Sequence, residues 1–481
     1  MEIIETERHR TPVKDELKLF LGACREAAEE DAHDKVASIT LRTRALDPLA
    51  VLESIYAREE HHFYLEKRSA GWALAGAEAV VLGAFAGRER MAAAKAWSAE
   101  VLAHTIAVGD LDAPFSGPHF YTGIGFEEDA AAGDAFPPAL VYLPRWQVAR
   151  TENGTTAVAN FLVQPGADLD ALTDRLWGAY EKFTTFGYGE SAPPRPSRPE
   201  RAVEVGRSGD FVGRVGVALA AIRREEVQKV VLARAVDTTF DQPFRPLVTL
   251  AGLRERFPSC YAFSFENDRG QSFIGATPER LVRVAGGILE TEALAGSAAR
   301  GDSAWEDARI AETLLASEKD GREHAHVVDS IARRLARLEV NLERAAPPSV
   351  LTLPNVHHLR TPLRGSLPAG RHLLDVVEAL QPTPAVGGVP RERAVPLIRA
   401  PEPFRRGLYA GSVGYFDHRG EGEFCVGLRA ALVEGTRARL YAGAGIVAGS
   451  DPEAEWRETE MKFAALREAI GAAPSERGSS G

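Results

Sequence analysis

One lysine, Lys229, lies in a segment that otherwise has the composition of a buried β-strand, Gln228–Arg234. On the two-residue period of a strand, Lys229 shares its face with Val231 and Ala233. Burial disfavours the charged form of an amine, so a lysine placed here can act as a general base near neutral pH. A lysine on an edge strand, with its ammonium group in water, is the alternative interpretation.

A glutamate, Glu279, follows Pro278 where a predicted strand ends. Loops at strand ends often carry catalytic groups. Together, Lys229 and Glu279 form an acid/base pair with opposite starting protonation, which is the arrangement that pKa tuning produces at many active sites. Taken alone, Glu279 beside Arg280 would be interpreted as part of a surface ion pair.

Carboxylates recur at the spacing of one helical turn in two predicted helices. Glu455 and Glu458 are followed by Lys462 at i, i+3 and i+7, and Asp320 and Glu323 are also three residues apart. Carboxylate oxygens are hard ligands that suit Mg²⁺, which takes few protein groups and keeps several waters. A solvated, charged helix face would produce the same pattern.

Two glycine-containing segments indicate close approach of the backbone to a ligand. One contains Gly296 and Ser297, and the other contains Gly443 and Gly445 and predicts a turn whose N–H groups bind a carboxylate. The second segment superficially resembles a dinucleotide-binding fingerprint. Only one predicted helix follows it, which leaves no room for the second strand of a βαβ unit.

An arginine, Arg429, is predicted within a strand spanning Glu423–Val433. It would share one face with three small residues, Cys425, Gly427 and Ala431, and a guanidinium above such a row can donate two hydrogen bonds to a carboxylate. A structural ion pair is the alternative interpretation of this arginine.

Several of these segments, in this order, resemble the chorismate-utilising enzymes, and most closely the isochorismate synthases. The resemblance extends over about Arg201–Ala473 and is specific because separated motifs agree. These motifs are Gln228–Arg234, Gly275–Leu281, Leu294–Ser297, Lys319–His324, Ala442–Val447 and Glu455–Lys462.

The resemblance implies a role for each candidate side chain. Lys229 would be the base that activates water, and Glu279 the general acid. Mg²⁺ would be bound directly by Glu323 and Glu458, with Asp320 and Glu455 holding waters or supporting the ligands. The substrate-binding positions implied are Gly296, Ser297, His358, Tyr409, Arg429, Gly443, Gly445 and Lys462. For His358 and Tyr409, a satisfied polar group in the core is the alternative.

The implied reaction is the reversible, Mg²⁺-dependent conversion of chorismate to isochorismate, in which water adds at C2 and the C4 hydroxyl is lost. Relatives that add ammonia have a glutamine-type residue in place of Lys229 and usually work with a glutaminase, so no glutaminase subunit is expected here. Salicylate synthases, which also eliminate pyruvate, are the nearest alternative, but Leu380–Gly388 and Glu455–Thr459 look more like isochorismate synthases. A non-catalytic chorismate-binding homologue would be expected to lack Lys229 or Glu279. The product would serve menaquinone or siderophore biosynthesis.

Composition limits the partners and the compartment. The 481 residues carry a net charge of −11 without a basic run, which argues against nucleic acid and anionic membranes. Cys24, Cys260 and Cys425 are too far apart for a disulfide framework or zinc cluster. The acidic N-terminus, Met1–Glu5, does not have the order of a signal peptide. We therefore expect a cytoplasmic protein, and a monomer.

Alternating strand and helix patterns predict an α+β fold with antiparallel sheet and helices outside. The family resemblance implies that large antiparallel sheets pack as a sandwich. Residues 1–200 carry no motif and are expected to be integrated in the same sheets. Residues 201–473 would form the chorismate-binding catalytic region, and 474–481 a disordered tail. Asn153-Gly154 predicts a hairpin turn. A helix is predicted over Glu323–Leu338, and a last one from about Pro452 to Ile470, capped by Ser450 or Asp451.

Overall fold

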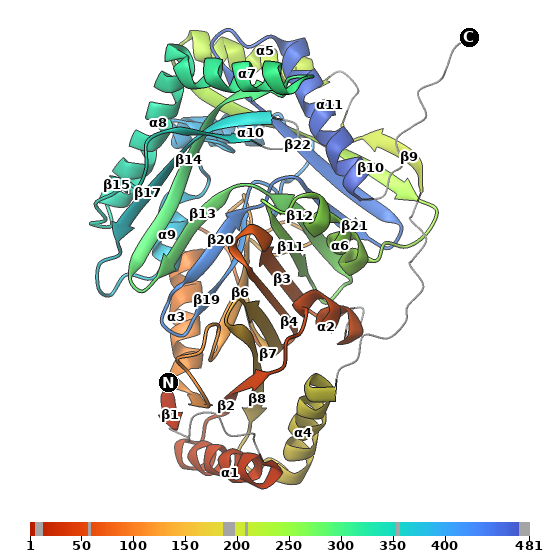
Figure 1. Ribbon diagram of the computed structural model, residues 1–481, viewed down its shortest axis with the longest axis vertical. Helices are drawn as coiled ribbons and strands as arrows, with labels where there is room; N and C mark the ends of the chain where they lie inside the picture. Colours follow the sequence, from red (N-terminus) through yellow and green to blue (C-terminus); the bar gives the residue numbers. More distant parts are fainter. Residues whose placement is uncertain (5–12, 56–58, 186–197, 207–209, 353–355, 471–481) are drawn as a thin grey trace.

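The computed structural model describes residues 1–4, 13–55, 59–185, 198–206, 210–352 and 356–470. The predicted tail, 474–481, and most of the proline-rich segment between Gly189 and Arg201 lie outside these residues. The predicted fold class is confirmed, since antiparallel strands form a large sheet system with helices on its outer faces (Figure 1).

Within the described residues, 22 strands form one continuous hydrogen-bonded network. Every pairing in the described residues is antiparallel except those of β5 with β1 and β2. The strands are β1 (Glu2–Ile4), β2 (Lys35–Thr43), β3 (His62–Lys67), β4 (Trp72–Phe85), β5 (Thr105–Val108), β6 (His119–Ile124), β7 (Ala139–Thr151), β8 (Gly154–Val163), β9 (Pro199–Glu204), β10 (Lys229–Phe240), β11 (Tyr261–Glu266), β12 (Gln271–Thr277), β13 (Arg280–Ala285), β14 (Ile288–Ala299), β15 (Glu343–Arg344), β16 (Ser349–Thr352), β17 (Val356–Ser366), β18 (Gly388–Val389), β19 (Ser412–Asp417), β20 (Gly422–Val426), β21 (Ala430–Glu434) and β22 (Arg437–Val447).

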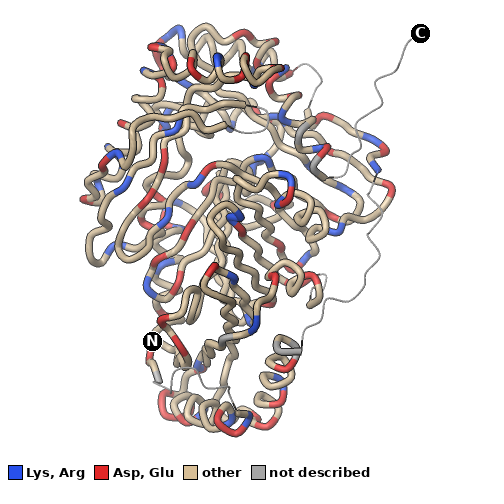
Figure 2. The backbone as a smooth tube through the Cα atoms, in the orientation of Figure 1, with Lys and Arg blue, Asp and Glu red and all other residues tan. Residues whose placement is uncertain are grey.

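The helices cover the outside of this network at both ends of the molecule (Figure 1). They are α1 (Lys14–Asp31), α2 (Pro48–Ile55), α3 (Arg90–Ala103), α4 (Leu169–Thr185), α5 (Asp210–Arg223), α6 (Pro246–Arg256), α7 (Ala304–Ala316), α8 (Glu318–Ala336), α9 (Leu373–Leu380), α10 (Arg391–Arg399) and α11 (Pro452–Ala469). No helix in the described part of the chain is long and apolar enough to cross a membrane. Basic and acidic residues are interspersed along the described chain (Figure 2).

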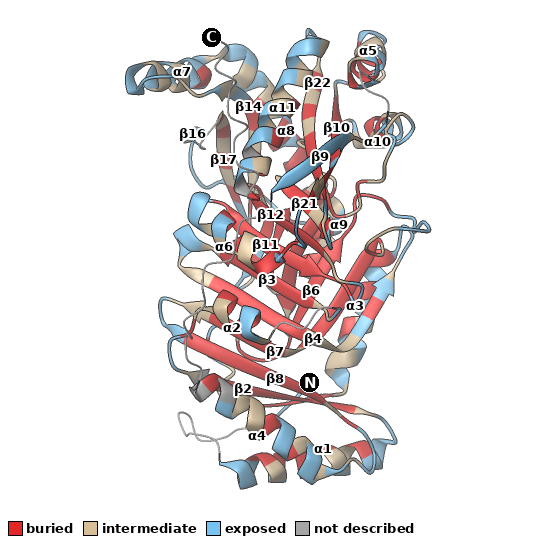
Figure 3. Ribbon diagram, turned by 90° about the vertical axis from the view of Figure 1, so that its right-hand side faces the viewer, coloured by how far each residue is buried: buried red, intermediate tan, exposed pale blue. Residues whose placement is uncertain are grey.

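Strands from the two halves of the sequence pair directly with one another. Strand β3 pairs with β11 and places Phe63 opposite Phe265, and β6 pairs with β19 and places Tyr121 opposite Tyr415. The rings of Phe63 and Tyr121 stack with their centroids 4.3 Å apart. These strands are buried in the middle of the molecule (Figure 3). Residues on both sides of position 200 therefore build one core.

The hairpin between β7 and β8 is confirmed, but its turn lies one residue earlier than predicted. Thr151 pairs with Gly154, so Glu152 and Asn153 form the two-residue turn. Gly154 adopts a φ of +131°, a value that glycine accommodates at little cost. The glycine thus belongs to the first strand position rather than to the turn.

Two helices, α8 and α11, carry the candidate metal ligands, and both have side-chain caps. Helix α8 begins at Glu318, earlier than the predicted Glu323, because the Ser317 hydroxyl accepts the backbone N–H of Asp320 at 3.2 Å. Its apolar stripe packs on β14 and includes Val327 and Ile331. Helix α11 is capped by Asp451, which accepts the N–H of Ala454 at 2.8 Å, and it packs on β22.

Candidate active site

Lys229 is the first residue of β10, and neighbours on both sides hold it within the sheet. It pairs with Val389 of β18 and with Val447 of β22, so the edge-strand interpretation is wrong. The side chain is 15% exposed, and its Nζ lies 3.2 Å from Oε1 of Glu323 on α8. The lysine and this candidate metal ligand are therefore in contact.

Gly445 provides the space that the Lys229 side chain occupies. A β-carbon at position 445 would lie 3.0 Å from Cε and 3.5 Å from Nζ of Lys229. Contacts this short require the neighbour to move. Gly443, two residues earlier on β22, has the same relation to Tyr409, because its β-carbon would lie 3.0 Å from the phenolic oxygen.

The prediction that Gly443 and Gly445 form a turn is wrong. Both lie within β22, which pairs with β10 without a break up to Val447. The glycines are required for close approach of side chains across the sheet rather than for a left-handed backbone. The predicted N–H nest is therefore replaced by an extended strand over which Lys229 and Tyr409 lie.

Lys462 joins α11 to the same strand. Its Nζ donates a hydrogen bond to the Gly443 carbonyl at 2.7 Å and forms an ion pair with Oε1 of Glu458 at 2.7 Å. Gly443 and Gly445 are about 7 Å apart along a strand. The Glu323–Lys229 pair thus contacts β22 at Gly445, and the Glu458–Lys462 pair contacts it two residues earlier, at Gly443.

Glu279 lies between β12 and β13 and is only 7% exposed. Burial raises the pKa of Glu279 to about 7; the Thr383 hydroxyl lowers it, the Glu292 charge raises it and the Lys229 charge lowers it. The surface-pair interpretation is wrong, because the Arg280 side chain instead contacts Glu290, Glu423 and Tyr261. A carboxyl group with this pKa can hold and deliver a proton near neutral pH.

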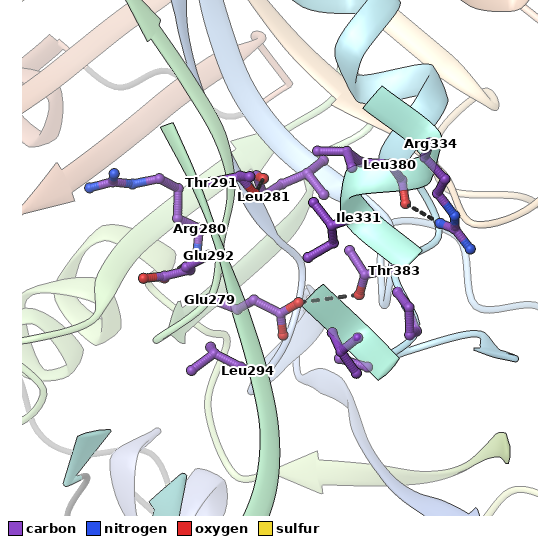
Figure 4. Close-up of a pocket in the computed structure, with 13 residues that line it drawn as sticks. Glu279, Arg280, Leu281, Thr291, Glu292, Leu294, Ile331, Arg334, Leu380 and Thr383 are labelled. Carbon is purple, nitrogen blue, oxygen red and sulfur yellow. Dashed lines mark hydrogen bonds between the residues drawn. The ribbon is translucent and has the colours of Figure 1, made fainter. Parts of the chain in front are cut away.

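A small internal cavity of about 10 Å³ lies beside Glu279 (Figure 4). This volume holds about one water molecule. A ring-shaped substrate does not fit in this volume. Thr291 and Thr383 are among the residues that line it.

Gly296 and Ser297 form a bulge in β14 where it pairs with β17. The register shifts between Ala295 and Ser297, and Gly296 adopts a φ of +76°. A β-carbon on Gly296 would lie 3.3 Å from Cβ of Asp320. The bulge therefore brings β14 against the first turn of α8.

Ser297 contacts His358 on the neighbouring strand, with Oγ 2.8 Å from Nδ1. The pKa of His358 is lowered to about 4, mainly by burial and also by the positive charges of Arg429 and Lys462. The imidazole is therefore neutral at physiological pH. The effect of both cations shows that Arg429 and Lys462 lie near the same ring.

The predicted position of Arg429 in a continuous strand is wrong. Strand β20 ends at Val426 and β21 begins at Ala430, because β20 pairs with β13 and β19 whereas β21 pairs with β12 and β22. Arg429 lies in the connection with a φ of +48°, a strained conformation for a residue with a side chain. It therefore does not share a strand face with Cys425.

Among the cationic side chains predicted to bind substrate, Arg429 forms no ion pair with the described residues. Burial lowers the pKa of Arg429. Its side chain makes no hydrogen bond or ion pair to any other described residue. A half-buried guanidinium left in this state gains most from an anionic ligand.

Tyr409 packs against β22 at Gly443. Its ring stacks on Tyr441 with centroids 4.9 Å apart and planes 10° from parallel. Burial raises the pKa of Tyr409, so its hydroxyl is neutral.

The acidic residues fit a Mg²⁺ ion held largely through water and substrate. Burial raises the pKa of Glu455; the hydrogen bond with Ser450 lowers it, and the nearby charge of Glu458 raises it. In the described residues, no three His, Cys, Asp or Glu side chains converge as a ready-made metal cage. Mg²⁺ commonly uses only one or two protein carboxylates. Glu323 and Glu458 could supply them after leaving their lysines, with Asp320 and Glu455 beside them.

His324, the neighbour of Glu323 in sequence, is a structural group. It is buried, and its Nε2 lies 2.6 Å from the Thr361 hydroxyl on β17. Thr383 and Glu292, by contrast, were not predicted from the sequence, although both influence Glu279. The sequence signal that could have pointed to Thr383 was the segment Leu380–Gly388, which matched the family pattern. The match did not indicate which side chain of the segment contacts Glu279.

Comparison with known proteins gives a family for this arrangement. A family model described as "Chorismate binding enzyme" matches residues 22–471. The chain belongs to this family.

Relatives in the same family are named as isochorismate synthases. The chain is 34% identical over 358 residues to isochorismate synthase MenF of Bacillus subtilis, covering 74% of this chain and 75% of that protein. It is 37% identical over 343 residues to the salicylate biosynthesis isochorismate synthase of Pseudomonas aeruginosa, covering 70% of each.

Solved structures show the same fold. The menaquinone-specific isochorismate synthase MenF of Escherichia coli superposes with a TM-score of 0.75 at 29% identity, covering 94% of this chain and 99% of that one. Anthranilate synthase component I of Streptococcus pneumoniae gives a TM-score of 0.67 at 22% identity, covering 83% and 92%, and supports the fold alone.

Proposed function

We propose that this protein is an isochorismate synthase that interconverts chorismate and isochorismate. The observation that carries the proposal is that one site holds both Lys229, an amine in a buried strand, and Glu279, a buried carboxyl whose pKa is raised to about 7 and is affected by the Lys229 charge. One can accept a proton while the other supplies one. The relatives named as isochorismate synthases support this choice within the family.

The reaction exchanges one hydroxyl for another. Lys229, as the neutral amine, accepts a proton from water as the water oxygen bonds to C2 of the ring. The ring double bond shifts, the C4–O bond breaks, and Glu279 gives its proton to the departing hydroxyl, which leaves as water. Lys229 has then gained one proton and Glu279 has lost one, so exchange with solvent restores both. Because Lys229 is paired with Glu323 here, that ion pair must open before the amine acts as a base.

Chorismate is a dicarboxylate, and two cations are available to bind it. Arg429 is unpaired among the described residues and can donate two parallel hydrogen bonds to one carboxylate. Lys462 lies between Gly443 and Glu458 and adds a second positive charge. The Ser297–His358 pair and Tyr409 supply neutral polar groups beside them.

Mg²⁺ would be held by Glu323 and Glu458, with Asp320 and Glu455 orienting its waters. When bound, it would neutralise and orient the ring carboxylate of the substrate. As a ligand of the ion, Glu323 would be less available to Lys229. The acidic residues thus have a role separate from proton transfer.

The biological setting proposed is a cytoplasmic monomer that needs no glutaminase subunit. Its product would enter menaquinone or siderophore biosynthesis. The menaquinone-specific enzyme of Escherichia coli covers 94% of this chain, which supports menaquinone.

Chromatography of a reaction with chorismate and Mg²⁺ tests the proposal. We expect a mixture of chorismate and isochorismate, reached from either compound, without salicylate. Ammonium salts should give no aminated product. Stoichiometric salicylate and pyruvate would identify a salicylate synthase, and the absence of conversion from either side would leave only a chorismate-binding protein.

A further inference from the structure

Thr383 provides the hydrogen bond that the Glu279 carboxyl receives from the described side chains. Its Oγ1 lies 3.2 Å from Oε1 of Glu279, across 104 residues of sequence (Figure 4). The other carboxyl oxygen points away from Thr383 in the same view. An oxygen that accepts a hydrogen bond from a hydroxyl is the unprotonated one, so the acidic proton belongs on the second oxygen.

The segment that carries Thr383 is fixed by two half-buried arginines. Nη1 of Arg334 donates to the carbonyls of Leu380 and Pro382, each at 2.9 Å. Nη1 of Arg391 donates to the carbonyl of Gln381 at 2.7 Å. Three successive carbonyls before Thr383 are therefore held in place, and the hydroxyl is directed at Glu279 without a cost of ordering a loop.

The charged groups around Glu279 are otherwise engaged or act at a distance. Glu292 on β14 accepts a hydrogen bond from Nε of Arg360 at 2.6 Å, and Lys229 on β10 is paired with Glu323. Arg280 donates a hydrogen bond to Glu290. Arg334 of α8 donates to the Leu380 carbonyl. The cavity beside the carboxyl has room for about one water molecule. Thr383 is thus the neighbour that touches the acid directly.

We propose that Thr383 is a positioning residue for the general acid: its hydroxyl holds Oε1 of Glu279 and leaves the second, protonated oxygen to face the departing hydroxyl. This inference rests on the proposed isochorismate synthase activity. It assigns a role in the reaction to a residue outside the predicted site. It also implies that Thr383 strengthens the acid, because a donated hydrogen bond favours the ionised carboxylate.

Thr383→Val tests this role, because valine has nearly the same shape and cannot donate a hydrogen bond. We expect kcat to fall about tenfold or more, with KM little changed. The alkaline limb of the kcat–pH profile should move upward by about one pH unit, since the ionised carboxylate loses its donor. Thr383→Ser keeps the hydroxyl and should restore both kcat and the limb.

Thr291→Val is the matched control. Thr291 lines the same cavity, but its hydroxyl donates to the Leu281 carbonyl at 2.7 Å. This variant should leave the alkaline limb where it is in the wild type. An equal shift in Thr291→Val, or no shift in Thr383→Val despite lost activity, would overturn the positioning role and leave a structural one.

An activity-free readout separates this inference from the proposed function. Burial raises the pKa of Glu279 to about 7, so the free energy of unfolding falls as pH rises from 4.5 to 7. In Thr383→Val this decline should continue to higher pH. An unchanged profile would overturn the hydrogen bond's effect on Glu279, whatever the reaction. If the wild type converted no chorismate while the profile shifted, the proposed function would fail and the contact would stand.

Discussion

Replacing Glu279 with glutamine should stabilise the protein relative to the wild type only above about pH 4.5, where the carboxyl of the unfolded chain ionises. Glutamine keeps an oxygen that accepts the Thr383 hydrogen bond but carries no charge. Burial raises the pKa of Glu279 from 4.5 to about 7. Below pH 4.5 the carboxyl is protonated in both the folded and the unfolded chain, so its titration has no effect there.

The magnitude follows from the size of this shift. Between pH 4.5 and 7 the unfolded carboxyl ionises while the folded one stays protonated, so the contribution of Glu279 to wild-type stability declines with rising pH. At 1.36 kcal/mol per pH unit, the full penalty is about 3 kcal/mol above pH 7. The stability of Glu279→Gln relative to wild type should therefore rise by about this amount from pH 4.5 to above 7.

Urea unfolding of both proteins across pH 4.5 to 8.5 measures the effect. Other titrating groups are common to both proteins, so the difference between them isolates Glu279. Glu292→Gln is the matched variant, because loss of its charge lowers the pKa of Glu279 and should end the decline at lower pH. A stability difference between Glu279→Gln and wild type that stayed constant with pH would refute the buried, protonated acid. Turnover in Glu279→Gln should be lost at every pH.

Three further predictions concern binding and catalysis. Lys229→Ala should abolish turnover, while calorimetry with Mg²⁺ should still detect chorismate binding. Arg429→Ala should instead weaken that binding by about 10- to 100-fold, since charge-assisted hydrogen bonds are lost. Wild-type-like turnover in Lys229→Ala would show that Lys229 is not the base. Gly445→Ala should lower kcat, because the new β-carbon would lie 3.0 Å from Cε of Lys229; unchanged kcat would show that the lysine moves freely. Glu323→Gln and Glu458→Gln should each remove most of the activity, and a metal titration should show that the remainder no longer depends on Mg²⁺. Full Mg²⁺-dependent activity in both variants would show that the carboxylates of α11 form only a solvated charged face.

Local sequence patterns predicted the fold class and many element positions, because alternation and caps act over a few residues. The cap at Asp451 and the strand containing Lys229 are examples. The glycines of β22 were misassigned, because a glycine required for side-chain approach has the same sequence signal as one in a turn. Arg429 was misplaced because strand propensity continues across it, and the break arises from the different partners of β20 and β21.

Contacts between distant segments were beyond the reach of these patterns. Thr383 reaches Glu279 across 104 residues, and only the packing of α9 and its following segment against β13 and α8 brings them together. The two lysine–glutamate pairs illustrate the same limit. The resemblance named Lys229, Glu323, Glu458 and Lys462 as site residues, but their pairing over two neighbouring glycines became visible only in the fold.

The central claim, exchange of a C4 hydroxyl for a new one at C2, is tested most directly with ¹⁸O-labelled water. Purified protein, chorismate and Mg²⁺ are incubated in labelled water, and the isochorismate formed is examined by mass spectrometry. The account predicts isochorismate heavier by 2 mass units with the label at the C2 hydroxyl, because water supplies that oxygen and the C4 oxygen departs. Isochorismate without label would contradict water addition, and Lys229 would then not be the water-activating base.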